Sequence, residues 1–139
     1  TLDRSSAASD VYKRQKEGGG KAGLALNPGT SLNFLNETVL SEMDYLLLMT
    51  VNPGFGGQKF IDSCLNKIRL ARHLLDNYKQ KTGRHILLQV DGGIDQQTIL
   101  PAAEAGAEVF VAGSAIFKDK NPSHALKTLR MCLHSKGKK

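Results

Sequence analysis

The chain has 139 residues, with 19 Lys and Arg against 13 Asp and Glu and a formal net charge of +6. Its composition is typical of one globular unit and excludes collagen, a disulfide scaffold and a disordered acidic tail. No apolar run approaches the roughly 20 residues of a membrane helix, so we expect no membrane partner. Two cysteines are too few for a disulfide framework or a four-cysteine zinc site. We therefore predict a reducing, cytoplasmic location.

Basic residues gather near the C-terminus, where residues 136–139 include three lysines and Lys118, Lys120 and Lys127 lie nearby in the sequence. No aromatic residues interleave them, as stacking on single-stranded nucleic acid would require. No helix-turn-helix or zinc-finger pattern is present either. We interpret the cluster as a solvated tail and expect no nucleic-acid partner. An anionic small-molecule substrate is equally compatible with the charge.

The first segment in chain order, residues 1–15, is polar and has neither a helical nor a strand period. Three glycines at residues 18–20 separate it from the first apolar run. We interpret residues 1–15 as a leader outside the domain, either disordered or an artefact joined to a truncated gene.

Four short apolar runs follow and are the predicted strands. Each ends at a turn signal that contains glycine. The runs are apolar on both faces instead of alternating, which is typical of strands buried in a parallel sheet. They are residues 22–26, 45–51, 86–90 and 109–112.

Helical patterns lie between and after these runs. Apolar residues at i, i+3, i+4 and i+7 predict an amphipathic helix over residues 59–80. A shorter helix is predicted over residues 96–105, and a last one over residues 121–133, where Pro122 suits the first turn. Residues 32–41 carry a weaker helical pattern. The alternation predicts an α/β protein with right-handed crossovers.

Glycine-rich segments follow three of the predicted strands, at residues 54–57, 91–93 and 113–114. The carboxyl ends of parallel strands are where α/β proteins bind ligands. Glycines there let backbone N–H groups approach a phosphate without an intervening Cβ. One such turn would be a simple chain reversal, but three at consecutive strand ends favour a phosphate site. They match neither a Walker A loop nor a dinucleotide fingerprint, so ATP hydrolysis and NAD binding are not expected.

Asp91 is the acid at these strand ends. Its position before two glycines places the carboxylate at the mouth of the sheet, where it could transfer a proton or bind a metal ion. An aspartate that opens a turn is the alternative, and the triplet alone leaves both open. Met49 is either core or an apolar pocket wall. Other acids, including Asp95 and Glu108, are expected to be surface charges, and the histidines are expected to be surface or packing residues.

Several of these segments together resemble one known family. The run Met-Thr-Val-Asn-Pro-Gly-Phe-Gly-Gly-Gln-Lys-Phe-Ile at residues 49–61 is the most specific, and the others are residues 25–30, 90–94 and 112–117. In this order they resemble ribulose-phosphate 3-epimerases, over residues 16–133. Residues 1–15 do not resemble the family.

The resemblance implies a (β/α)₈ TIM barrel of the ribulose-phosphate-binding type, of which residues 16–139 would be the C-terminal half, strands five to eight. It implies an epimerase of the pentose phosphate pathway that interconverts D-ribulose 5-phosphate and D-xylulose 5-phosphate through a metal-stabilised enediolate. The partner would be a small phosphosugar, and the full-length enzyme would be a homo-oligomer.

The resemblance also implies roles for particular residues. Asp91 would be one of two acid/base aspartates and a ligand of a divalent cation such as Zn²⁺, Fe²⁺, Mn²⁺ or Co²⁺. Met49 would line the apolar side of the enediolate site. The substrate and its phosphate would be held by Gly54, Phe55, Gly56, Gly57, Asp91, Gly92, Gly93, Gly113 and Ser114.

The family pattern is incomplete in this sequence. The partner aspartate and the His-x-Asp metal ligands that the family carries on its first four strands are not found. A barrel of this type takes about 250 residues. We therefore expect a fragment that is inactive alone. Alternatives are a related phosphosugar epimerase, such as one acting on allulose 6-phosphate, and a non-catalytic phosphate-binding half-barrel that pairs with another copy or partner.

Overall fold

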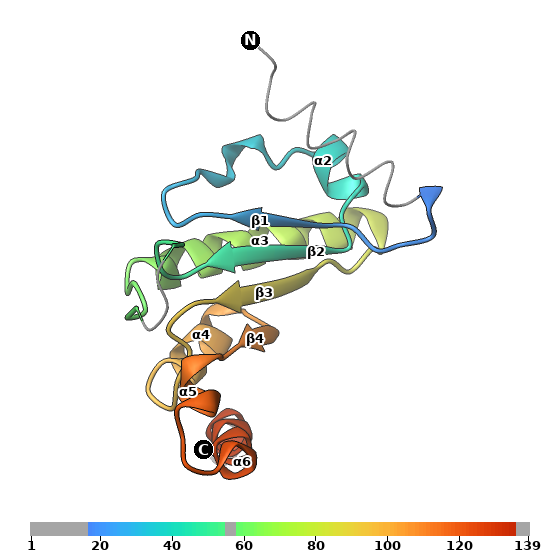
Figure 1. Cartoon of the computed structure of the whole chain (residues 1–139). Helices are drawn as coiled ribbons and strands as arrows, with labels where there is room; N and C mark the ends of the chain where they lie inside the picture. The colour runs from blue at the N-terminus through green and yellow to red at the C-terminus, as the bar shows by residue number, and fades with distance from the viewer. Residues whose placement is uncertain (1–16, 55–57, 136–139) are drawn as a thin grey trace.

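A parallel sheet organises the computed structural model, which describes residues 17–54 and 58–135 (Figure 1). Each neighbouring pair of strands is parallel, and the order in the sheet is the order in the chain. All four predicted strands are confirmed, with ends shifted by one or two residues. The strands are β1 (Gly23–Leu26), β2 (Tyr45–Met49), β3 (Leu87–Asp91) and β4 (Val109–Val111).

Helices connect the strands, which confirms the predicted α/β class. The long helix α3 (Cys64–Thr82) joins β2 to β3, and α4 (Ile99–Ala105) joins β3 to β4. The weak pattern between β1 and β2 forms two short pieces, η1 (Leu32–Phe34) and α2 (Glu37–Ser41). The last helix, α6 (Pro122–His134), begins after Asn121, whose side chain accepts a hydrogen bond from the amide of His124. Among the described helices, none combines the length and the apolar character needed to cross a bilayer.

The helix predicted from residue 59 begins only at Cys64. The amide of Ile61 donates a 2.8 Å hydrogen bond to the carbonyl of Thr50, just beyond the end of β2. This bond ties the segment to the sheet edge, so its backbone is not available for helical pairing. The apolar periodicity does not reveal the tie, because Ile61 continues the same spacing.

The helix predicted from residue 96 begins at Ile99. The Asp95 carboxylate accepts hydrogen bonds from the amides of Gln97 at 2.8 Å and Thr98 at 3.0 Å, which forms an Asx-type turn ahead of the helix. A further helix, α5 (Ser114–Phe117), was not predicted, because its four residues are too few to show a period.

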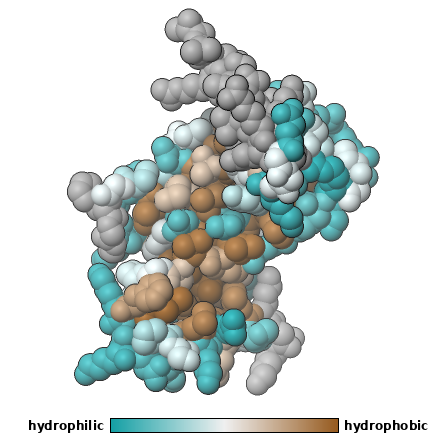
Figure 2. Space-filling model, turned by 45° about the vertical axis from the view of Figure 1, so that its right-hand side comes forward, coloured by the Kyte–Doolittle hydropathy of each residue, from teal (hydrophilic) through white to brown (hydrophobic). Residues whose placement is uncertain are grey.

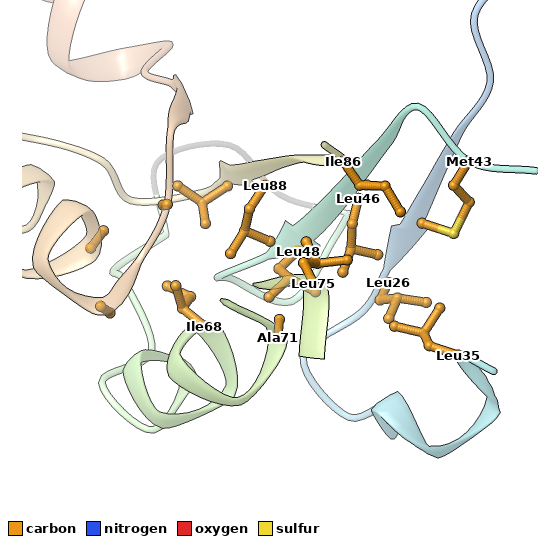
Figure 3. Packing of buried hydrophobic residues seen from close by; sticks show 14 of the residues in the cluster. Leu26, Leu35, Met43, Leu46, Leu48, Ile68, Ala71, Leu75, Ile86 and Leu88 are labelled. Carbon is orange, nitrogen blue, oxygen red and sulfur yellow. The ribbon is translucent and has the colours of Figure 1, made fainter. Parts of the chain in front are cut away.

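One face of the sheet packs against α3 and forms the core (Figure 3). Leu48 of β2 is in register with Leu26 of β1 and Val90 of β3. In Figure 3 Ile68, Ala71 and Leu75 of α3 lie against this set of strand residues. The core also includes Leu35, Leu40, Met43, Leu46, Tyr78, Ile86, Leu88, Ile94, Ile99, Ala102, Ala105, Ala107 and Leu129.

The opposite face of the sheet, turned toward the viewer in Figure 1, is only partly covered. Tyr45, Leu47 and Met49 of β2 are half-buried there, and Leu87 and Val111 are 41% and 38% exposed. Figure 2 shows a broad hydrophobic band across the molecule. The sequence predicted strands buried on both faces; this is wrong for the described residues, because none of their elements covers the second face.

Candidate functional site

The carboxyl ends of the strands meet at one edge of the sheet and open into a cleft of about 700 Å³. Clefts of this size hold small organic ligands. Its lining combines residues of β2, β3 and the segments that follow β2, β3 and β4. Among the residues predicted for the site, those lining the cleft are Met49, Gly54, Asp91, Gly92, Gly93, Gly113 and Ser114. Phe55, Gly56 and Gly57 lie outside the described residues, so their predicted role stays a prediction.

Asp91 is the last residue of β3, in register with Met49 of β2 and Val111 of β4. Its side chain is half-buried and lines the cleft. Among the described residues no group donates a hydrogen bond to this carboxylate, and no cation pairs with it. The turn-opening hydrogen bonds that were the alternative role are made by Asp95 instead. The Asp91 carboxylate is therefore free to exchange a proton with a ligand in the cleft.

Gly92 and Gly93 are required by the fold itself. Their φ angles are +125° and +69°, values that favour glycine. A Cβ at Gly92 would lie 2.5 Å from a methyl carbon of Val51, and one at Gly93 would lie 2.3 Å from the backbone nitrogen of Phe60. These two glycines let the end of β3 pack closely against the segments that follow β2. Ligand binding is not needed to explain why glycine occupies these two positions.

Gly113 differs from them. Its φ of −72° suits any L-residue, and, apart from its neighbours in the chain, no described residue places an atom within 4 Å of a Cβ built there. Neither backbone conformation nor packing therefore requires a glycine at this position. The missing side chain instead leaves open space at the cleft.

Four backbone amides at this edge have no partner among the described residues. The N–H groups of Gly92, Gly93, Gly113 and Ser114 donate no hydrogen bond to a described acceptor. Backbone N–H groups without a protein acceptor form hydrogen bonds with water or with a ligand. Four of them around one cleft form a set of donors suited to an anion.

Thr50 was missed by the sequence analysis, although it organises the site. It is fully buried, and its hydroxyl donates to the carbonyl of Gly92 at 2.5 Å. Its amide donates to the carbonyl of Asp91 at 2.9 Å. These two bonds hold the end of β3 against the end of β2. A signal was present in the sequence, since Thr50 is a polar residue within an apolar run.

Glu108 is exposed, as predicted, and its carboxylate also joins a polar network. Its carboxylate lies 2.5 Å from Nη1 of Arg72 and 2.8 Å from Nε2 of His85. Partial burial acts to raise the pKa of Glu108, but the hydrogen bonds from Arg72 and His85 outweigh it and hold that pKa below its ordinary value. Glu108 and His85 precede β4 and β3, so the network lies at the edge opposite the cleft and is structural.

A metal ion is not accommodated by the described residues alone. Within residues 17–54 and 58–135, no three His, Cys, Asp or Glu side chains gather closely enough to share an ion. Asp91 is the one carboxylate among the described residues that line the cleft. A single carboxylate falls short of the four ligands of a typical zinc site.

Comparison with known proteins identifies the family. The model of the ribulose-phosphate 3-epimerase family matches residues 2–117, a range that includes most of the segment interpreted above as a leader. A ribulose-phosphate 3-epimerase of Serratia marcescens is 53% identical over 102 residues, 73% of this chain and 46% of its own length. That of Buchnera aphidicola subsp. Baizongia pistaciae is 50% identical over 86% of this chain and 50% of its own length. The Escherichia coli K12 enzyme is 46% identical over 83% of this chain and 49% of its own length.

Solved structures of TIM-barrel type share the fold at low identity. A 3-hexulose-6-phosphate synthase matches with a TM-score of 0.65 and 22% identity, covering 95% of this chain and 58% of its own. An orotidine 5'-monophosphate decarboxylase of Sulfolobus solfataricus matches with a TM-score of 0.59 and 14% identity, covering 91% and 55%. The chain spans about half the length of the curated relatives it matches. By the family match and these identities, it belongs to the ribulose-phosphate 3-epimerase family.

Proposed function

We propose that this chain supplies half of the active site of a ribulose-phosphate 3-epimerase. The observation that carries the proposal is the cleft at the carboxyl edge, which is lined by Asp91 and by four residues whose backbone amides, like the Asp91 carboxylate, have no partner among the described residues. In this proposal residues 16–139 are strands five to eight of a (β/α)₈ barrel. The substrate is a ketose phosphate, D-ribulose 5-phosphate or D-xylulose 5-phosphate.

The phosphate would bind at the amides of Gly92, Gly93, Gly113 and Ser114. The open space at Gly113 lets a phosphate oxygen come close to the backbone there. The amides of Gly92 and Gly93 follow β3, and those of Gly113 and Ser114 follow β4. Phosphate binding at these two neighbouring strand ends would fix the orientation of the sugar and so keep the reacting carbon in place. Met49, in register with Asp91, would provide an apolar wall beside the reacting carbons.

Asp91 would exchange the proton on C3. Epimerisation removes a proton next to the C2 carbonyl and returns one to the opposite face of the same carbon. A carboxylate on one strand end reaches one face, so a second acid/base group is needed for the other. Asp91 is the one carboxylate that the described residues bring to the cleft. We therefore propose that the 139-residue chain binds its substrate but does not turn it over alone. The divalent metal implied by the resemblance is not assigned to these residues.

The test combines a binding and an activity measurement on the purified chain. Adding D-ribulose 5-phosphate should shift the amide NMR signals of Gly92, Gly93, Gly113 and Ser114, whereas D-ribulose without the phosphate should leave them unchanged. A coupled assay for D-xylulose 5-phosphate should detect no turnover. Binding of both sugars alike would contradict the phosphate site, and turnover near that of a complete epimerase would contradict the need for a second group.

The single carboxylate also favours a second candidate, a phosphate-binding unit with no catalytic role. The substitution Asp91→Asn separates the two. In a complete barrel containing these residues it should abolish epimerisation and leave phosphate binding nearly unchanged. A complete barrel that shows no epimerisation even with Asp91 present would support the second candidate. Allulose 6-phosphate, tested with an assay that detects its own C3 epimer, distinguishes the related epimerase.

A further inference from the structure

The cleft carries one positive side chain among its described lining residues, Lys118. In the sequence, Lys118 lies near the C-terminal basic cluster, which is predicted to be a solvated tail. Lys118 is indeed exposed, but it also lines the cleft together with Gly113, Ser114 and Asp91. Within the part of the chain that the structure describes, its ammonium group makes neither an ion pair nor a hydrogen bond. Its charge is therefore not neutralised by a described protein group.

The backbone fixes Lys118 next to the end of β4. Its amide donates a 3.0 Å hydrogen bond to the carbonyl of Ser114, and the amide of Phe117 donates a 3.0 Å bond to the carbonyl of Gly113. These bonds close the single turn of α5, so Lys118 lies one turn beyond Ser114 on the same side of that turn. The lysine and the amides of Gly113 and Ser114, which have no described partner, thus belong to one local unit.

A phosphate bound in the cleft would need a positive charge nearby to balance it. A phosphate monoester carries about −1.5 to −2 charges at pH 7, and the Asp91 carboxylate in the same cleft adds further negative charge. Backbone amides are neutral donors and do not balance that charge. We propose that Lys118 neutralises the phosphate of the bound ketose and thereby selects phosphorylated over unphosphorylated sugars. This inference rests on the proposed function and adds a specificity-determining residue to it.

The experiment compares Lys118→Gln with two matched controls, Lys120→Gln and Lys127→Gln. All three substitutions remove one charge from an exposed lysine in the same part of the chain, but only Lys118 lines the cleft. Inorganic phosphate is the probe, titrated while the amide NMR signals of Gly113 and Ser114 are followed. Lys118→Gln should weaken phosphate binding about tenfold, the scale of one exposed charge-assisted hydrogen bond, and should reduce its dependence on salt. The control variants should bind within about twofold of the unmodified chain, and Lys118→Arg should restore most of the affinity.

The outcomes separate this inference from the proposed function. An unmodified chain that shows no phosphate-induced shift at Gly113 and Ser114 would overturn the proposed phosphate site. Phosphate binding that persists unchanged in Lys118→Gln would leave that site standing and overturn the role of Lys118. Equal losses in Lys118→Gln and Lys120→Gln would also overturn it, since they would show an effect of net charge alone.

Discussion

Gly113→Ala provides the sharpest test of the phosphate site, because the structure predicts a loss of phosphate binding with little change in stability. The alanine methyl group would enter space in which, apart from its chain neighbours, no described atom lies within 4 Å. The φ of −72° and ψ of −71° are compatible with alanine. The substitution therefore places a methyl group at the cleft without disturbing the protein around it.

The expected change in the free energy of unfolding is small. Replacing a glycine of compatible conformation stabilises a protein by about 0.4–1 kcal/mol, because it restricts the unfolded chain. Alanine is a poorer residue than glycine before the first turn of a helix, which offsets this gain by a few tenths of a kcal/mol or more. The net effect should lie within about 1 kcal/mol of zero. Phosphate binding should weaken about tenfold or more, because the methyl group separates the phosphate oxygens from the amides.

Gly93→Ala is the matched control, with the opposite expectation. Its left-handed backbone costs alanine roughly 1–2 kcal/mol, and the clash with the Phe60 backbone at 2.3 Å adds roughly 1–3 kcal/mol of overpacking. Urea unfolding of both variants, with phosphate titration of each, measures the two quantities. A Gly113→Ala chain that binds phosphate as tightly as the unmodified one would refute the reasoning. So would a Gly113→Ala chain as destabilised as Gly93→Ala.

Three further predictions concern other side chains of the fold. Thr50→Val should lower the free energy of unfolding by about 1–3 kcal/mol in urea melts, because it removes a buried hydroxyl and leaves the Gly92 carbonyl unpaired; Thr50→Ser should lose less. Because the pKa of Glu108 lies below its ordinary value of 4.5, its stabilising contribution is present above that pH and is lost as the pH falls through the lower folded-state pKa. Glu108→Gln should therefore lower stability at neutral pH and flatten this acid dependence. Burial raises the pKa of the Cys64 thiol, so a thiol reagent should modify Cys132 first in the folded chain.

The strand positions could be predicted from the sequence because a buried parallel strand is a local signal. Each run is short, apolar and bounded by a glycine turn, and these features do not depend on distant residues. Helix starts were less predictable. The helix after β2 begins late because the amide of Ile61 donates a hydrogen bond to the carbonyl of Thr50. The apolar periodicity of the sequence does not indicate this contact.

The site was predictable in outline for a related reason. Parallel strands place their carboxyl ends at one edge, so Asp91 and Gly113 had to lie near each other once the strands were found. The sequence could not show which glycines are required by packing and which leave space for a ligand. A Cβ at Gly92 or Gly93 would clash with Val51 or Phe60, whereas a Cβ at Gly113 would meet no described residue beyond its chain neighbours. Only the three-dimensional packing distinguishes these cases.

The partly exposed face of the sheet and the single carboxylate of the cleft are connected. Along β2 and β3 the register pairs Tyr45 with Leu87 and Met49 with Asp91, so the exposed face runs from apolar residues to the edge that carries Asp91. Exposed apolar surface costs about 25 cal/mol per Å² relative to burial, which favours an additional element that covers this face. Such an element would end at the same edge as Asp91, because the face and the cleft are continuous. Under the proposed function, it would therefore be placed to supply the second acid/base group for inversion at C3. The element that covers the exposed face would then also complete the catalytic pair.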